Sequence, residues 1–154
     1  MSYNTIKLNA HSKCIEEMTA LATIAPGMLV ELYSTAGYCR KHSTLHGNAI
    51  PMFALERQEF GKEIADTFEA GDKVNVWFPY RGDKVNALLD DGENVARGDF
   101  LVSNGDGFLK KYDATGESTE GPMAKIVAVA DEAVNRSSSS GVAGGVGRIR
   151  VIVA

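Results

Sequence analysis

Cysteine and long apolar runs are both scarce in this sequence. Cys14 and Cys39 are the only cysteines, too few for the disulfide framework that holds small secreted domains together. The longest apolar stretches span a handful of residues, against the roughly 18 that a membrane-spanning helix needs. The opening residues 1–5 also lack the positive charge and apolar segment of a secretory signal. We therefore expect free thiols, synthesis in a reducing cytoplasm, and no membrane partner.

Positive charge is in deficit. The 154 residues include 16 Lys and Arg against 20 Asp and Glu, for a net charge of −4. A protein that binds nucleic acid generally carries a basic surface to neutralise phosphates, so no nucleic-acid partner is expected. A chain of this length forms one domain whose core needs no disulfide or metal to support it.

Catalytic and metal-binding signatures are few. Cys39, His42 and His46 have the residue types and approximate spacing of zinc ligands, but a structural site needs a fourth ligand, and only the remote His11 could supply it. Neither cysteine has the neighbours that activate a nucleophile. We predict no catalytic residue, no cofactor and no metal, and expect alanine at residues 39, 42 and 46 to leave stability nearly unchanged.

Glycine, in contrast, is plentiful: 16 residues, many of them beside Asp at short intervals along the chain. The runs between these turn signals are short and rich in Val, Phe, Trp and Leu, which is typical of an all-β sandwich or barrel. In the last run, Ile149, Val151 and Val153 alternate with Arg148 and Arg150, as expected of a half-buried strand. Strands are predicted at residues 28–33, 37–42, 50–56, 73–78, 84–89, 99–103, 107–112, 124–130 and 148–153.

Two segments do not follow this pattern. Residues 12–22 place Ile15, Met18 and Ala22 at helical spacing after Ser12, a good N-cap. They form either a short helix or an extended arm that becomes ordered against a partner. Residues 135–147 are a flexible Gly/Ser loop. The predicted organisation is an N-terminal arm or short helix at 1–22 and a single β domain at 23–154.

Two further stretches carry local expectations. Residues 92–101 have the spacing G-x-x-V-x-x-G-D-x-L and in this resemble biotinyl and lipoyl carrier domains. The lysine that those domains present at an exposed hairpin tip has no counterpart, so the resemblance favours a similar β-sandwich topology and not a carrier function. The Trp-Phe-Pro-Tyr stretch at 77–80 could lie in the core or at an interface. The core is favoured, because large aromatic side chains are buried on average.

The order of several segments is more specific than any one of them. They are 26–31 (PGMLVE), 40–43 (RKHS), 51–56 (PMFALE), 71–74 (GDKV) with Trp77, 88–107, 128–134 (AVADEAV) and 148–151 (RIRV). From about Thr23 to the C-terminus, this order resembles the small head-decoration, or cement, proteins of tailed bacteriophages.

The resemblance implies a compact β-tulip or β-sandwich domain on the outer surface of an expanded icosahedral phage head. It implies binding to the major capsid protein, bridging of its subunits, and association with other copies as a dimer or trimer at local symmetry axes. Such proteins are not enzymes, and their N-terminal arm often reaches a neighbour. We therefore expect the partner-binding residues to be Tyr3, Ile6, Leu8, Ile15 and Met18, and deletion of residues 1–20 to leave a folded domain.

Two alternatives remain open at this point. The chain could be a small β-barrel carrier or ligand-binding module without catalytic activity, which a defined pocket or a modified lysine would favour. It could instead be a metal-dependent enzyme that uses Cys39, His42 and His46, which stoichiometric zinc would favour.

Overall fold

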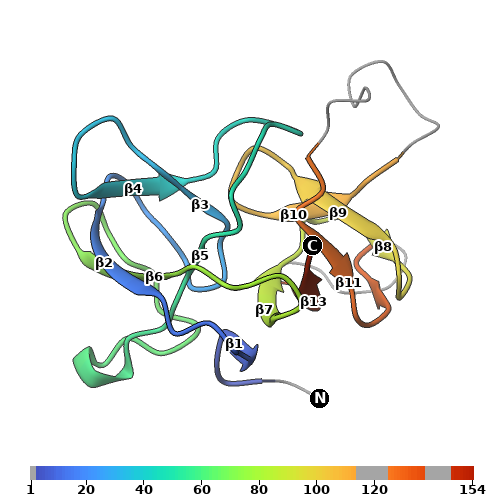
Figure 1. The fold of residues 1–154 in the computed structure, drawn as a ribbon, viewed down its shortest axis with the longest axis horizontal. Helices are drawn as coiled ribbons and strands as arrows, with labels where there is room; N and C mark the ends of the chain where they lie inside the picture. The colour runs from blue at the N-terminus through green and yellow to red at the C-terminus, as the bar shows by residue number, and fades with distance from the viewer. Residues whose placement is uncertain (1–2, 114–124, 138–146) are drawn as a thin grey trace.

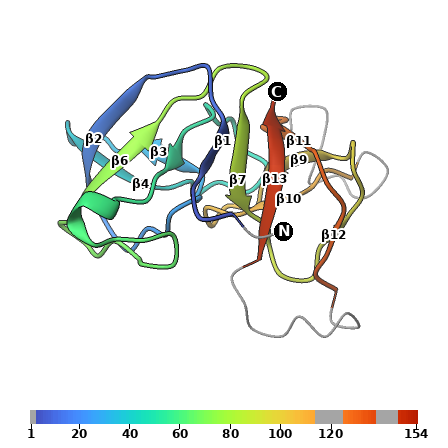
Figure 2. The same ribbon diagram turned by 90° about the horizontal axis from the view of Figure 1, so that it is seen from below.

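A computed structural model describes residues 3–113, 125–137 and 147–154 (Figures 1 and 2). These residues form an all-β fold, as predicted, and their one helical element is the 3-10 turn η1 (Gln58–Phe60). Within these ranges, no helix is long and apolar enough to cross a membrane. The strands are β1 (Lys7–Asn9), β2 (Ile15–Ala20), β3 (Val30–Leu32), β4 (Tyr38–Lys41), β5 (Phe53–Ala54), β6 (Lys73–Trp77), β7 (Lys84–Leu88), β8 (Asn94–Val95), β9 (Phe100–Ser103), β10 (Leu109–Lys111), β11 (Ala128–Ala130), β12 (Val134–Asn135) and β13 (Arg148–Val153).

The first sheet has five strands in the order β3-β4-β2-β6-β5. It curls until its edges meet, because Leu29, just before β3, bridges Phe53 of β5. The amide of Val30 also donates to the carbonyl of Met52 at 2.9 Å. We call this closed sheet the N-terminal barrel; it lies on the left of Figure 1. Its interior is filled by Met18, Ala20, Val30, Cys39, Met52, Val74 and Val76.

The second sheet has six strands in the order β1-β7-β13-β11-β9-β10. Leu89, directly after β7, forms a parallel bridge with Leu109 of β10, so the sheet from β7 to β10 also closes on itself. We call this ring the C-terminal barrel; β1 is attached to it along β7, and β8 pairs with β12 beside it. Its inward-facing side chains include Val85, Ala87, Leu101, Leu109, Ala128, Ala130, Ile149, Val151 and Val153.

Strand β7 joins the two barrels. Val85 and Ala87 belong to the C-terminal core, whereas Leu88, on the opposite face, belongs to the N-terminal core. Close by, the guanidinium of Arg148 donates to the carbonyls of Pro26 at 2.9 Å and Ile64 at 2.8 Å. Gly27 is required here: its φ is +91°, and a Cβ atom would lie 2.5 Å from Arg148 Nη1. The barrels therefore pack directly on each other through backbone as well as side chains.

The helix alternative for residues 12–22 is wrong. Residues Ile15–Ala20 are strand β2, which pairs antiparallel with β6 and parallel with β4 in the middle of the N-terminal barrel. The Ser12 hydroxyl donates to the carbonyl of Phe78 at 2.6 Å instead of capping a helix. Only the second half of β2 is buried, so its sequence lacks the alternation that identifies a strand. The segment is extended, but the strands it pairs with belong to its own chain.

Every predicted strand overlaps an observed one, and the hairpin between 28–33 and 37–42 forms as β3 and β4. The strands not predicted are β1, β2, β8 and β12. Trp77 is fully buried, as expected, but Tyr80 is exposed. Of the predicted Gly/Ser loop at 135–147, residues 138–146 lie outside the described part of the chain.

Candidate interaction surface

The segment that precedes β2 is held in place by a buried carboxylate. Asp83 accepts hydrogen bonds from the backbone amides of His11 at 2.8 Å, Ser12 at 3.1 Å and Tyr80 at 2.9 Å, and contacts His11 Nδ1 at 3.0 Å. Burial alone would raise the pKa of Asp83, but these hydrogen bonds outweigh it and lower the pKa below its usual value. The ionised Asp83 thus fixes His11 and Tyr80 on either side of itself.

A second carboxylate fixes the chain before β1. Glu56 accepts hydrogen bonds from the hydroxyl of Thr5 at 2.5 Å and the amide of Ile6 at 3.1 Å. The carbonyl of Ile6 accepts from the amide of Asn86 at 2.8 Å, and its side chain is fully buried in the C-terminal core. Ile6 therefore anchors the N-terminal segment to the C-terminal barrel.

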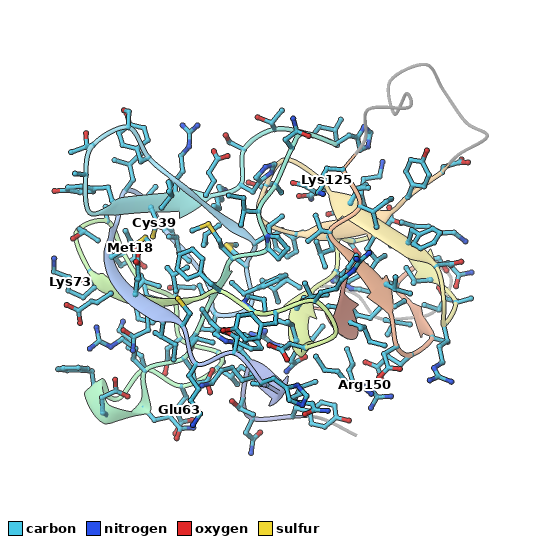
Figure 3. The ribbon with its side chains drawn as sticks, in the orientation of Figure 1. Met18, Cys39, Glu63, Lys73, Lys125 and Arg150 are labelled. Atoms are coloured by element: carbon cyan, nitrogen blue, oxygen red, sulfur yellow. The ribbon has the colours of Figure 1, made fainter. Side chains whose placement is uncertain are left out.

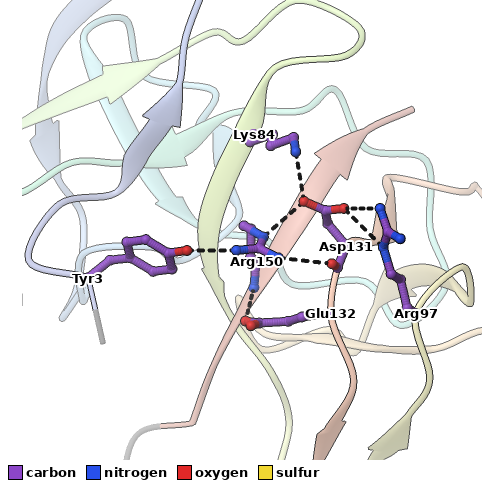
Figure 4. Close-up of polar contacts among 6 residues, drawn as sticks. All are labelled: Tyr3, Lys84, Arg97, Asp131, Glu132 and Arg150. Carbon is purple, nitrogen blue, oxygen red and sulfur yellow. Dashed lines mark hydrogen bonds and ion pairs between the residues drawn. The ribbon is translucent and has the colours of Figure 1, made fainter. Parts of the chain in front are cut away.

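Asp131 is the third anchor (Figure 4). Its side chain accepts from Lys84 Nζ at 2.9 Å, Arg150 Nε at 2.9 Å and Arg97 Nη2 at 3.2 Å, and Arg150 Nη1 donates to the Tyr3 hydroxyl at 2.6 Å. The hydrogen bond from Lys84 lowers the pKa of Asp131; burial opposes this, and Arg97 and Arg150 reinforce it. Residues 3–12 are thus tied to the two barrels by contacts with Asp83, Glu56 and Arg150.

These contacts decide which of the expected partner-binding residues can face a partner. Ile6 and Met18 are buried in the two cores, so the prediction for these two side chains is wrong. Tyr3 and Leu8 are partly buried, and Ile15 is exposed. Burial thus leaves Ile15 as the best-exposed apolar residue of the predicted set.

The sequence analysis missed two further exposed side chains of this region. Tyr80 follows β6, whose Trp77 pairs with Ile15, and lies with the exposed His11 beside Asp83. No signal in the sequence separates Tyr80 from the buried Trp77, because exposure rises step by step through the half-buried Phe78 and Pro79. We define the N-terminal face as Leu8, His11, Ile15 and Tyr80. These four side chains belong to segments whose backbone is held by Asp83 or by strand pairing.

The zinc-like residues do not form a metal site. Cys39 is buried in the N-terminal core, and burial raises the pKa of its thiol to about 11, which disfavours the thiolate that a metal would need. His42 Nε2 lies 3.1 Å from the carbonyl of Asn48 and donates to it, and Nδ1 lies 2.6 Å from the Ser103 hydroxyl, so both ring nitrogens have protein partners. Across the described residues, no group of three or more His, Cys, Asp or Glu is placed to hold a metal ion.

In the described part of the chain, Ser103, His42 and Glu31 lie in an order that resembles a nucleophile–base–acid arrangement. The Oε2 atom of Glu31 lies 3.8 Å from His42 Nε2, beyond hydrogen-bonding range. Ser103 is fully buried, and its Oγ accepts from the amide of Gly105 at 3.1 Å. A substrate could not reach this hydroxyl in the folded chain, so the cluster links the two barrels and is not arranged for catalysis.

An open hollow of about 470 Å³ lies beside η1, lined among others by Glu17, Arg57, Phe60, Phe68 and Lys73. Arg57 is buried, donates to Glu17 Oε2 at 3.0 Å and places its guanidinium 4.3 Å from the centre of the Phe60 ring. A fixed cation beside exposed aromatic surface is a feature of sites for small polar ligands.

The chain was compared with known protein families, curated proteins and solved structures. No known protein family matches the chain, and neither does any curated protein. Among solved structures, the fold is similar to the N base of the head fiber protein gp8.5 of bacteriophage phi29, with a TM-score of 0.56 and 10% sequence identity. The match covers 92% of this chain and 93% of that one. At this identity the similarity shows a shared fold, and it extends over nearly the whole of both chains.

Proposed function

We propose that the chain is a non-enzymatic structural protein of a bacteriophage virion, and specifically a decoration protein that binds the outer surface of the expanded head. Its partner would be the major capsid protein, whose subunits it bridges. The observation that carries the proposal is the likeness to a phage head fiber base along nearly the full length of both chains. Because fold does not determine function, this likeness supports the proposal only together with the surface described above.

The architecture suits such a role. The two closed barrels pack on each other across β7 and are linked by the hydrogen bonds of Arg148 to the carbonyls of Pro26 and Ile64, which makes a stiff body. The N-terminal face presents Ile15 and Tyr80 on a backbone fixed by Asp83, so little side-chain or loop ordering opposes binding. Modest contacts suffice if one copy touches more than one subunit. Binding to the expanded shell and not to its precursor would stabilise the expanded shell by linkage.

Co-sedimentation with undecorated phage heads tests the proposal. The protein should pellet saturably with expanded heads, at a fixed ratio to the major capsid protein, and stay in solution with unexpanded shells. Serine at both Ile15 and Tyr80 should weaken this binding by about tenfold or more, because apolar anchors dominate interfaces. The matched control is serine at Leu32 of β3, whose exposure of 59% is close to the 61% of Tyr80. If the native protein binds neither expanded heads nor unexpanded shells, the proposal is refuted.

The hollow beside Phe60 favours a second candidate, a ligand-binding module without catalysis. A bound small molecule would appear as the difference between the native and denatured masses of the protein purified from its own virus or host. Methionine at Arg57 should then remove that difference, because it deletes the buried cation of the hollow. Equal native and denatured masses would exclude a tightly bound ligand.

A further inference from the structure

A row of apolar side chains crosses the outer face of the C-terminal barrel. Phe100 of β9 pairs directly with Val129 of β11, which pairs with Ile152 of β13. Tyr112 directly follows β10, and its amide donates to the carbonyl of Phe100 at 2.8 Å. Tyr112 therefore lies opposite Phe100 and extends the row. Directly paired residues point to the same face of a sheet, and Phe100 is 53% exposed. We call Tyr112, Phe100, Val129 and Ile152 the apolar row.

Cations border this row on both sides. Lys84 pairs with Ile152, and Arg150 lies two residues from Ile152 on the same face of β13. On the other side, Arg81 and Lys125 line a hollow together with Ile126. Figure 3 shows Lys125 and Arg150 on opposite sides of β9 and β11. On and next to these strands, basic side chains outnumber acidic ones: Arg81, Lys84, Arg97, Lys110, Lys111, Lys125 and Arg150 against Asp99, Asp113, Asp131 and Glu132. Asp131 pairs with Lys84, Arg97 and Arg150, and Asp99 pairs with Lys111.

The N-terminal barrel carries a surface of the opposite character. The loop from η1 to β6, residues 58–72, exposes the Phe60 ring by 69%. It carries the carboxylates of Glu59, Glu63, Asp66, Glu69 and Asp72, with Lys62 as its one basic residue. Figure 3 places Glu63 at the end of the molecule away from Lys125.

This acidic loop has a defined shape. The Asp66 carboxylate accepts from the amide of Glu63 at 2.8 Å, and the Asp72 carboxylate accepts from the amide of Glu69 at 2.9 Å. The guanidinium of Arg57 packs against the Phe60 ring, 4.3 Å from its centre. The loop therefore presents the exposed Phe60 ring on a segment of net negative charge, without first having to become ordered.

We propose that the acidic loop of one copy of this chain docks on the apolar row of a second copy, with Phe60 against Phe100. The carboxylates of the loop would face the cations that border the row, so the two surfaces match in both charge and polarity. Because the two surfaces differ and lie on different barrels, the contact is head-to-tail. It leaves a free loop at one end and a free row at the other, and such contacts build closed rings or open chains.

Sedimentation velocity of the purified protein over a dilution series tests this proposal without any phage shell. The native protein should self-associate at low salt, and the association constant should fall by about tenfold or more at high salt, where charges are screened. Lysine at Glu63 and Glu69 gives a loop-reversed variant, and glutamate at Arg81 and Lys125 gives a row-reversed variant. Each variant alone should be monomeric. An equimolar mixture should associate again, because the basic loop of one then meets the acidic row of the other.

The matched control is Glu16→Lys compared with Glu63→Lys. Both residues are exposed, but Glu16 lies on β2, outside both surfaces, so only Glu63→Lys should weaken self-association. Circular dichroism should show that all variants remain folded. A native protein that stays monomeric at about 100 μM and low salt would overturn the proposal, as would a mixture that does not associate. If that monomer still bound expanded heads, the proposed function would stand without this inference.

Discussion

Replacing Asp131 by asparagine tests the network that ties the N-terminal segment to the C-terminal barrel. The Arg97 pair contributes about 0–1 kcal/mol, since this side chain is 75% exposed. Lys84 and Arg150 are about one-third exposed, at 34% and 30%, and a hydrogen bond to a charged group contributes about 1.5–3 kcal/mol. These contributions share one carboxylate and do not add fully. We expect a loss of about 3 kcal/mol, equivalent to a fall in Tm of about 6–12 °C for a chain of this size.

The effect should depend on pH in one direction. The pKa of Asp131 is lowered in the folded protein, so the folded state favours the ionised form. The resulting stabilisation is complete above the unfolded pKa of about 3.9 and disappears as the pH falls through the lower folded value. The stability difference between the native protein and Asp131→Asn should therefore be full at pH 7 and shrink below about pH 4.

Urea denaturation at a series of pH values measures both quantities. The matched control is Asp106→Asn, which removes an exposed carboxylate paired with Lys41 and should change stability by less than about 0.5 kcal/mol. If Asp131→Asn costs no more than this control, or if its cost does not shrink in acid, the buried network does not stabilise the fold as argued.

Four further predictions concern the two cores and the zinc-like residues. Deleting residues 1–20 removes β1 and β2, so we now expect the N-terminal barrel to unfold; a truncated protein with native circular dichroism and protease resistance would contradict this. A thiol reagent such as DTNB should label the exposed Cys14 in the native protein and Cys39 only after denaturation, because burial raises the pKa of Cys39 to about 11; rapid labelling of both would contradict this. Alanine at His42 should cost about 2–4 kcal/mol in chemical denaturation, because the Ser103 hydroxyl and the Asn48 carbonyl lose a buried partner. Elemental analysis of the native protein should find no stoichiometric zinc, whose presence would revive the metal interpretation.

Strands that carry their own local signal were predictable. β13 alternates between Ile149, Val151, Val153 and two arginines, and β6 and β7 follow Gly-Asp turns. Strands β1 and β2 could not be identified in the same way, because their burial comes from distant partners. Ile6 is covered by a barrel whose strands begin at Lys84, and the exposed half of β2 includes Glu16 and Glu17.

The candidate surface was predictable only in part, because burial of the N-terminal residues depends on partners that are distant in the sequence. Choosing N-terminal apolar residues as partner-binding identified the exposed Ile15 but also the buried Ile6 and Met18, since hydrophobicity does not distinguish a core from an interface. The expectation that alanine at residues 39, 42 and 46 would be tolerated also changes. Cys39 and His42 are buried, so their loss would destabilise the protein through packing and hydrogen bonding, and stability alone cannot report on a metal.

The position of β13 within the C-terminal barrel has a consequence for synthesis of the chain. β13 lies between β7 and β11. The barrel therefore cannot close until residues Arg148–Val153 have left the ribosome. The N-terminal barrel is complete once β6 has emerged, because all its strands lie between Ile15 and Trp77. Folding during translation would therefore proceed from the N-terminal barrel. The apolar faces of β7, β9 and β11 would remain exposed until β13 is synthesised. Chaperones would therefore matter most during synthesis of the segment between β11 and β13.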